Sequence, residues 1–135
     1  MTLIEIMVVI TLLGILMATL GVSLFGTFEE GKVKIALTQM ETLKGRLDGY
    51  KLEYGRYPST SEGLNALVSP PPKKSGRTPG AFLDDETLLT DPWETPLQYY
   101  APARSGGKPF EIVSLGSDQA PGGEGTNADI SNWQK

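Results

Sequence analysis

The chain begins with MTLIEIMVVITLLGILMATLGVSLFGTF (residues 1–28), a stretch in which Glu5 carries the only charged side chain. The next charge is Glu29, so residues 6–28 could cross a bilayer as a helix of roughly 35 Å. A carboxylate at mid-membrane costs about 2.5 kcal/mol or more and therefore usually has a partner. The cation within easiest reach of Glu5 is an α-amino group, its own or that of a neighbouring copy. This pattern indicates a membrane-anchored subunit that assembles with copies of itself.

The composition limits the function as well as the fold. At 135 residues the chain has room for one anchor and one small soluble domain. A net charge of −4 and a pI near 4.8 argue against a nucleic-acid partner. The chain contains no Cys and no His, which excludes disulfides, thiolate metal sites, and most catalytic triads and zinc sites. Carboxylate or lysine chemistry stays open, but we expect no enzymatic activity.

The amino terminus differs from a secretory signal peptide, which carries Lys or Arg before its apolar core and small residues at a cleavage point. Here no basic residue precedes the apolar stretch, and residues 27–30 do not resemble a cleavage site. The basic flank that orients a membrane helix is also missing. We therefore expect that a basic leader has been removed from this chain or is left out of it.

The helical pattern continues beyond the apolar stretch. Apolar residues recur four and three positions apart at Ala36, Met40, Leu43, Leu47, Tyr50 and Tyr54. This spacing predicts an amphipathic helix with one buried face. Gly55 and Pro58 are typical of a helix end, so we predict one helix to about Glu53. Residues 1–28 would lie in lipid or in a fibre core, and residues 29–135 would form a globular domain.

The rest of the chain predicts a small α+β domain. Ser59 and Glu62 match the capping-box pattern S-x-x-E and predict a short helix over about 60–68. Weak strand signals lie at residues 82–83, 88–89, 97–100 and 110–115. We therefore expect a small antiparallel sheet, followed by a loop rich in Gly and Asp that begins at residue 116.

This acidic loop has some features of a cation site. Asp118 and Asp129 are spaced like the first and twelfth positions of an EF-hand, but Ala120 and Gly122 stand where that motif places oxygen ligands. The loop gathers oxygens and glycines with almost no apolar packing, and a hard cation such as Ca²⁺ would supply cohesion. From spacing alone, a solvated surface loop is the better interpretation.

Several stretches together resemble a known family. TLIEIMVVI (2–10) is similar to the signature that opens type IV pilins and type II secretion pseudopilins after leader cleavage. The resemblance is narrowed by YKLEYGRYPST (50–60) with EGL (62–64), by DPW (91–93), and by SLGSD (114–118) with NADISNW (127–133). Together these stretches resemble the major pseudopilins of the type II secretion system over nearly the whole chain.

The resemblance implies a pilin-like fold, in which a long amino-terminal helix packs on a small antiparallel sheet closed by a carboxyl-terminal calcium-binding loop. It also implies a structural subunit that polymerises into a periplasmic pseudopilus and helps to export folded proteins through the outer membrane. Before assembly such a subunit spans the Gram-negative inner membrane once, surrounded by lipid, with its globular domain in the periplasm. Its partners would be further copies, minor pseudopilins, the inner-membrane assembly platform and the prepilin peptidase.

The candidate site residues fall into two groups. At the amino terminus, the assembly residues are Met1, Thr2 and Glu5. The Glu5 carboxylate of one subunit would neutralise the Met1 amine of the following subunit and so set the axial step of the polymer. The resemblance adds that a prepilin peptidase exposes Met1 and that this residue is N-methylated. In the acidic loop, it implies a Ca²⁺ site with ligands from Asp118, Asp129, Asn127 and the carbonyls of Leu115 and Ser117.

The chain departs from the family pattern at three positions. Met1 replaces the usual Phe, and is either natural, an artificial start or a modified residue written as Met. Gly21 lies where relatives often carry Pro, which leaves a helix kink open. Ala128 lies where many relatives have an acidic residue, so the calcium site would need Glu124, a carbonyl or a water instead.

Two rival interpretations make different predictions. A type IV major pilin usually carries a carboxyl-terminal disulfide loop, and this chain has no Cys. A membrane-anchored periplasmic enzyme or binding domain would show a cleft with perturbed carboxylates and would stay monomeric after detergent extraction.

Overall fold

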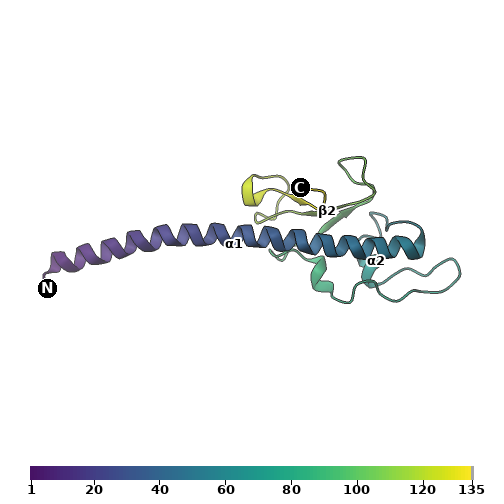
Figure 1. Ribbon diagram of the computed structural model, residues 1–135, viewed down its shortest axis with the longest axis horizontal. Coiled ribbons are helices and arrows are strands. Elements are labelled where there is room, and N and C mark those ends of the chain that lie inside the picture. Colours follow the sequence, from purple (N-terminus) through teal and green to yellow (C-terminus); the bar gives the residue numbers. More distant parts are fainter. Residues whose placement is uncertain (135) are drawn as a thin grey trace. The chain divides into compact units, whose positions relative to one another are not determined.

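The computed structural model describes residues 1–134, apart from the side chains of residues 22 and 23. Its elements are α1 (Leu3–Tyr54), α2 (Asn65–Val68), the 3₁₀ helix η1 (Glu86–Leu89), β1 (Gln98–Tyr100), β2 (Glu111–Ser114), the 3₁₀ helix η2 (Gly125–Asn127) and β3 (Ile130–Ser131) (Figure 1). The chain divides into two compact units, Met1–Gly31 and Lys32–Lys135. The α+β class and the long first helix are confirmed, whereas the lipid boundary expected after residue 28 stays a prediction.

In the first unit, α1 keeps its apolar side chains on the outside. Large apolar residues from Met1 to Phe28 are exposed on every face of the helix. The helix is long and apolar enough to cross a membrane, and none of its apolar window is buried within the protein. This unit therefore has no core of its own, and its apolar surface needs lipid or another protein chain as a partner.

In the second unit, α1 forms one wall of a closed core. Its predicted stripe is confirmed up to Tyr50, because Ala36, Met40, Leu43, Leu47 and Tyr50 are all 0% exposed, whereas Tyr54 at its end is only partly buried. They pack in one cluster with residues from α2 and the sheet, among them Leu67, Phe110 and Ile112. Burial of each large apolar side chain contributes about 1.5–3 kcal/mol, so this face of α1 holds the globular unit together.

The sheet is antiparallel with strand order β1-β2-β3. Tyr99 pairs with Ile112, and Val113 pairs with Ser131. The two strands predicted around residues 97–100 and 110–115 are confirmed, but β3 was not predicted because only two residues form it. The Asn132 side chain extends this edge, since its Oδ1 accepts a hydrogen bond of 2.8 Å from the Ile112 amide.

The predicted second helix is shorter than expected. The Ser59–Glu62 capping box forms, with the Ser59 amide 2.7 Å from Glu62 Oε2 and the Glu62 amide 3.3 Å from Ser59 Oγ. Gly63, however, has φ +62°, in the left-handed region that a continuing helix cannot use. The box therefore closes a turn, and α2 begins only at Asn65.

The strands predicted at 82–83 and 88–89 are wrong. The amides of Phe82 and Leu83 both donate to the Leu67 carbonyl, which holds this segment against α2 instead of in a sheet. Residues 86–89 form η1, because Asp85 caps it by accepting hydrogen bonds from the amide and hydroxyl of Thr87. Local side-chain capping thus replaces strand pairing at this point.

Candidate functional site

The amino terminus of α1 is closed by a capping box between Thr2 and Glu5. The Glu5 amide donates to Thr2 Oγ1 over 3.3 Å, and the Thr2 amide donates to Glu5 Oε2 over 3.4 Å. This local role was not predicted, although Thr2-x-x-Glu5 has the same capping-box signature as Ser59 and Glu62. The box satisfies two amides that would otherwise lack a partner at the start of the helix.

The capping box leaves most of the Glu5 carboxylate free to bind elsewhere. Only Oε2 is engaged, and 3.4 Å is long for a charge-assisted hydrogen bond. Within residues 1–134, no ion pair joins Glu5 to the amine of its own Met1. The structure therefore brings the three predicted residues, Met1, Thr2 and Glu5, to one exposed helix end, and it leaves the charge of Glu5 without an internal cation.

In the acidic loop, Asp118 and Asp129 hold neighbouring parts of one glycine-rich turn. Asp118 Oδ1 accepts from the Ala120 amide at 3.2 Å, and Asp129 Oδ1 accepts from the Gly122 amide at 3.1 Å. At Gly123, which has φ +101°, an added Cβ would lie 2.5 Å from the Asn127 carbonyl oxygen and 3.1 Å from Asp118 Oδ2. Two oxygens thus converge where only glycine fits.

The other predicted ligands lie in the same loop. The Ser117 amide and hydroxyl both donate to the Thr126 carbonyl, at 3.2 and 3.1 Å, and the hydroxyl also contacts Asn127 Oδ1. Leu115 follows β2 directly and precedes Gly116, where an added Cβ would meet the carbonyl oxygens of residues 126 and 128 at 3.1 and 2.8 Å. All five predicted residues therefore fall within one loop between β2 and β3.

This donor set has the chemistry of a hard-cation site. It consists of carboxylate and carbonyl oxygens, the ligands that Ca²⁺ prefers, and it offers none of the nitrogen or sulfur ligands that zinc favours. No group of three or more acidic, His or Cys side chains that could hold a metal occurs within residues 1–134. A calcium site in this loop would have two carboxylates, and carbonyls or waters would have to complete its six to eight oxygens.

The DPW stretch anchors this loop, a role that its sequence did not reveal. Asp91 is buried and accepts hydrogen bonds from the amides of Trp93 and Thr95 at 3.1 and 2.9 Å, and from the Ser114 hydroxyl at 2.6 Å. The Trp93 carbonyl in turn accepts from the Gln119 side chain at 2.7 Å. Asp91 thereby holds the turn of residues 91–95 against the end of β2. The same turn holds the start of the acidic loop through the Trp93 carbonyl.

A polar pocket of about 480 Å³ lies where α1 ends, lined in part by Glu53, Arg56, Glu62 and Lys73. Two ion pairs line it: Lys73 contacts Glu53, and Arg56 Nη1 lies 2.7 Å from Glu62 Oε2. The hydrogen bond from Arg56, supported by Ser59, lowers the pKa of Glu62 to about 2. A general acid at neutral pH needs a raised carboxyl pKa, whereas the pKa of Glu62 is shifted in the opposite direction.

Comparisons with known proteins cover both candidate regions. The family described as "Type II secretion system (T2SS), protein G" matches residues 23–133. The chain is 42% identical over 135 residues to the type II secretion system core protein G of Pseudomonas aeruginosa, covering 98% of this chain and 92% of that protein. It is 40% identical over 134 residues to the protein of the same description from Vibrio cholerae, covering 98% of this chain and 89% of that protein.

The structure is similar to the crystal structure of the major pseudopilin from the type 2 secretion system of enterohaemorrhagic Escherichia coli. The two share a TM-score of 0.65 and 31% sequence identity, and the match covers 82% of this chain and 93% of that one.

Proposed function

The chain belongs to the protein G family of the type II secretion system, the major pseudopilins that form the pseudopilus, and we propose that it polymerises through α1 to drive export of folded proteins across the outer membrane. The family is structural rather than enzymatic, and its fold is pilin-like. The rival enzyme and type IV pilin interpretations therefore lose their support.

The observation that carries this proposal is the unpartnered apolar surface of the first unit. Leu3, Met17 and Phe25 are 80%, 73% and 74% exposed on different parts of α1. At about 25 cal/mol per Å², leaving such side chains in water is costly. Lipid would cover them before assembly, and helices of neighbouring copies would cover them afterwards, helped by the open space around Gly14 and Gly21.

Glu5 would set the register of this packing. Its carboxylate is held at the helix end by Thr2 and has no internal cation. In the apolar interior of a fibre, pairing with the amine of the next subunit's Met1 would offset the cost of burying both charges. A step that misplaced this pair would leave two uncompensated charges, so only one axial step would be favoured.

Calcium would order the acidic loop. Asp118 and Asp129 would supply the charged ligands, with the Asn127 carbonyl or side chain and the carbonyls of Leu115 and Ser117 as further donors. When bound, the ion neutralises the two carboxylates and cross-links the end of β2 to the start of β3. The glycines at 116 and 123, which allow the carbonyls to approach, support this arrangement.

The remaining expectations concern processing and location. Membership of the family implies partners of the type II secretion system and self-assembly, and the apolar helix is consistent with the inner membrane and periplasm. We extend this to cleavage by a prepilin peptidase, N-methylation of Met1, one membrane crossing, and contacts with minor pseudopilins and the inner-membrane assembly platform.

The test is complementation. A bacterium lacking its own major pseudopilin would receive this chain behind a cleavable basic leader, and we expect restored pseudopili and restored secretion of exoproteins. Mass spectrometry of the amino terminus would report cleavage and methylation in the same cells. Stable expression and membrane insertion without either pseudopili or secretion would contradict the proposal, and surface pili without secretion would favour a type IV pilin.

A further inference from the structure

Charge is segregated along the sequence of the globular unit. Residues 78–103 and 109–134 contain acidic residues but no Lys or Arg. Outside α1, basic residues occur instead at Arg56, at Arg104 and Lys108 in the β1–β2 loop, at Lys135, and in the segment after α2 that contains Lys73, Lys74 and Arg77. This separation of acidic from basic segments matters for a protein that contacts copies of itself, because complementary charges steer and orient association.

The basic loop, residues 73–77, has a defined conformation. The Lys73 amide donates to the Arg77 carbonyl and the Gly76 amide donates to the Lys73 carbonyl, both over 2.8 Å. Lys73 pairs with Glu53 on α1, whereas Lys74 and Arg77 are exposed. The loop also forms one side of the 480 Å³ polar pocket. Two cations are thus presented to the outside on a closed turn, with a hollow next to them.

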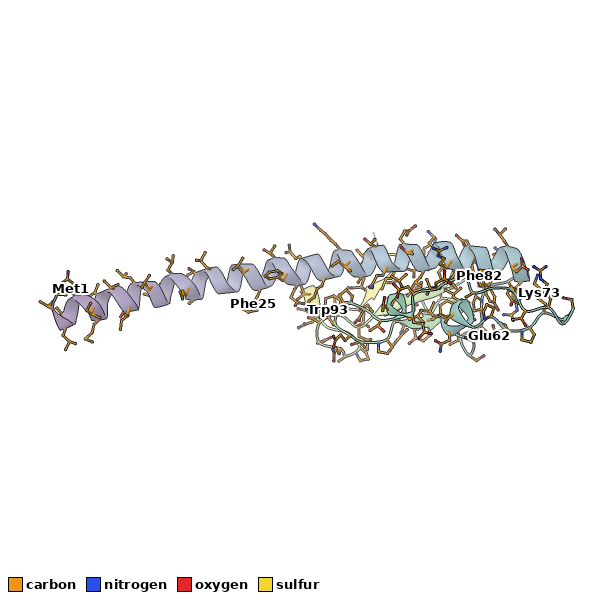
Figure 2. All side chains as sticks on the ribbon, turned by 90° about the horizontal axis from the view of Figure 1, so that it is seen from below. Met1, Phe25, Glu62, Lys73, Phe82 and Trp93 are labelled. Carbon is orange, nitrogen blue, oxygen red and sulfur yellow. The ribbon has the colours of Figure 1, made fainter. Side chains whose placement is uncertain are left out.

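The acidic end of the unit, defined by Glu94, Asp118 and Glu124, is built around Trp93. The turn that follows Asp91 exposes Glu94, which has φ +64°, and the Trp93 carbonyl holds the Gln119 side chain next to Asp118. Figure 2 shows Trp93 and Lys73 at opposite ends of the globular unit. Glu94 directly follows Trp93, and Lys74 directly follows Lys73, so the exposed acidic and basic residues belong to opposite ends of the unit.

We propose that the basic loop of one copy binds the acidic end of another copy in a head-to-tail contact. This inference rests on the proposed polymerisation. A contact between two different surfaces of the same chain does not close on itself and can continue as an open helical fibre. Two basic ends or two acidic ends would repel each other, so the same charges would impose one direction on every subunit.

Glu94 carries this contact independently of calcium. An ion bound between Asp118 and Asp129 would neutralise those carboxylates, but Glu94 lies outside the acidic loop and would keep its charge. The competing occupant of the basic loop is an anionic lipid surface. We favour a second copy because lipid-binding clusters usually contain four to eight basic residues, whereas two of the cations near this pocket, Lys73 and Arg56, are already paired with carboxylates.

A charge swap in the full-length chain tests the contact. In the complemented strain, Lys74→Glu and Glu94→Lys should each lower the amount of pseudopilus by about fivefold, the effect expected from losing exposed ion pairs. The two changes together should restore it. Arg46→Glu is the matched control, an exposed cation in the carboxyl-terminal part of α1 with the same change of charge, and should keep the parent level.

Cysteine cross-linking gives a second readout, since the chain contains no Cys. Lys74→Cys with Glu94→Cys should yield an oxidised ladder of dimers, trimers and longer species. Either change alone should give no cross-link at this contact, because the single cysteine then faces a residue without a thiol. The pair Lys74→Cys with Arg46→Cys is the control and should give no ladder.

The possible failures are distinguishable. If the parent chain forms no pseudopili, the proposed function fails. If it forms them but the swap does not restore assembly and no ladder appears, only this inference is overturned. Normal assembly of Lys74→Glu, combined with loss of binding to anionic vesicles, would replace the second copy with a lipid surface.

Discussion

The two units use the same helix in opposite ways. In the first unit, apolar residues surround α1 on all faces and stay exposed, whereas in the second unit one stripe of them, from Ala36 to Tyr50, is 0% exposed. The difference lies in both composition and pattern, since charged residues separate the apolar ones in the second stretch and are few in the first. A helix that is apolar all round must be covered by other molecules, whereas a striped helix can be covered by its own chain.

This comparison separates folding from assembly. Changes in the stripe should act on the stability of the globular unit, and changes in the first unit should act on the polymer while leaving the fold intact. Each of the following experiments tests whether that division holds.

The largest effect is expected at Glu5. Glu5→Ala removes the proposed partner of the neighbouring Met1 amine and should lower pseudopilus formation by at least 100-fold, because a buried unpaired charge costs about 3–5 kcal/mol. The chain should still insert in the membrane, since alanine is cheaper there than a carboxylate. Electron microscopy of sheared fibres and alkaline extraction of membranes measure the two outcomes. Thr2→Ala, which removes only the cap, should lower assembly far less; equal losses would assign Glu5 a purely local role.

The next largest effect is expected from Leu47, in the buried stripe. Leu47→Ala leaves a cavity in the core and should destabilise the globular unit by about 2–5 kcal/mol. Leu52→Ala on the same helix is the matched control and should change stability by less than about 0.5 kcal/mol, because Leu52 is 90% exposed. Denaturant unfolding of the full chain in detergent, followed by Trp fluorescence, measures both. Similar losses at the two positions would break the division between the faces of α1.

Periodicity predicted the long helix and its buried face because both follow from the spacing of residues along one element. The four-three stripe from residue 36 to residue 54 needs no knowledge of its partners. The shorter elements were harder to predict. Gly63 ends the turn begun by the Ser59–Glu62 box, and Asp85 caps η1 where strand composition predicted β structure. These outcomes depend on single backbone conformations and caps, which outweigh weak propensities.

The candidate site was predicted unevenly for the same reason. Spacing alone favoured a solvated loop around Asp118 and Asp129, and only the family resemblance implied that they bind calcium, a role that stays a prediction. The glycines that allow the carbonyls to approach were visible only as composition. The anchoring role of Asp91 could not be predicted, because Ser114 joins it from 23 residues further along the chain. Contacts of that kind are set by the tertiary fold and leave no local pattern.

Calcium should have an intermediate effect, confined to the second unit. At a free concentration of 100 times the dissociation constant, a bound ion stabilises the folded state by about 2.7 kcal/mol. We therefore expect the melting temperature of the full chain in detergent to rise with Ca²⁺ and fall with a chelator. Asp118→Ala and Asp129→Ala should remove this response, and Asp84→Ala, an exposed acidic residue outside the loop, should keep it. A response that persisted in both loop variants would place any bound ion elsewhere.

The smallest effect is expected from pH, through Glu62. Hydrogen bonds from Arg56 and Ser59 lower its pKa from 4.5 to about 2, so the unfolded chain binds more protons than the folded one between these values. The stabilisation is complete above about pH 4.5 and is lost as pH falls towards 2. Because the Glu62 side chain is 25% exposed, we expect its ionised carboxylate to stabilise the fold by about 1 kcal/mol after allowing for solvent screening.

Glu62→Gln should lower the unfolding free energy by this amount at pH 7 and by progressively less towards pH 3. Glu41→Gln, which alters an exposed pair with Lys44 at 3.8 Å, is the control for general acid sensitivity. A stability difference between the parent chain and Glu62→Gln that stayed constant from pH 7 to pH 3 would show that the capping turn gains nothing from the ionised carboxylate.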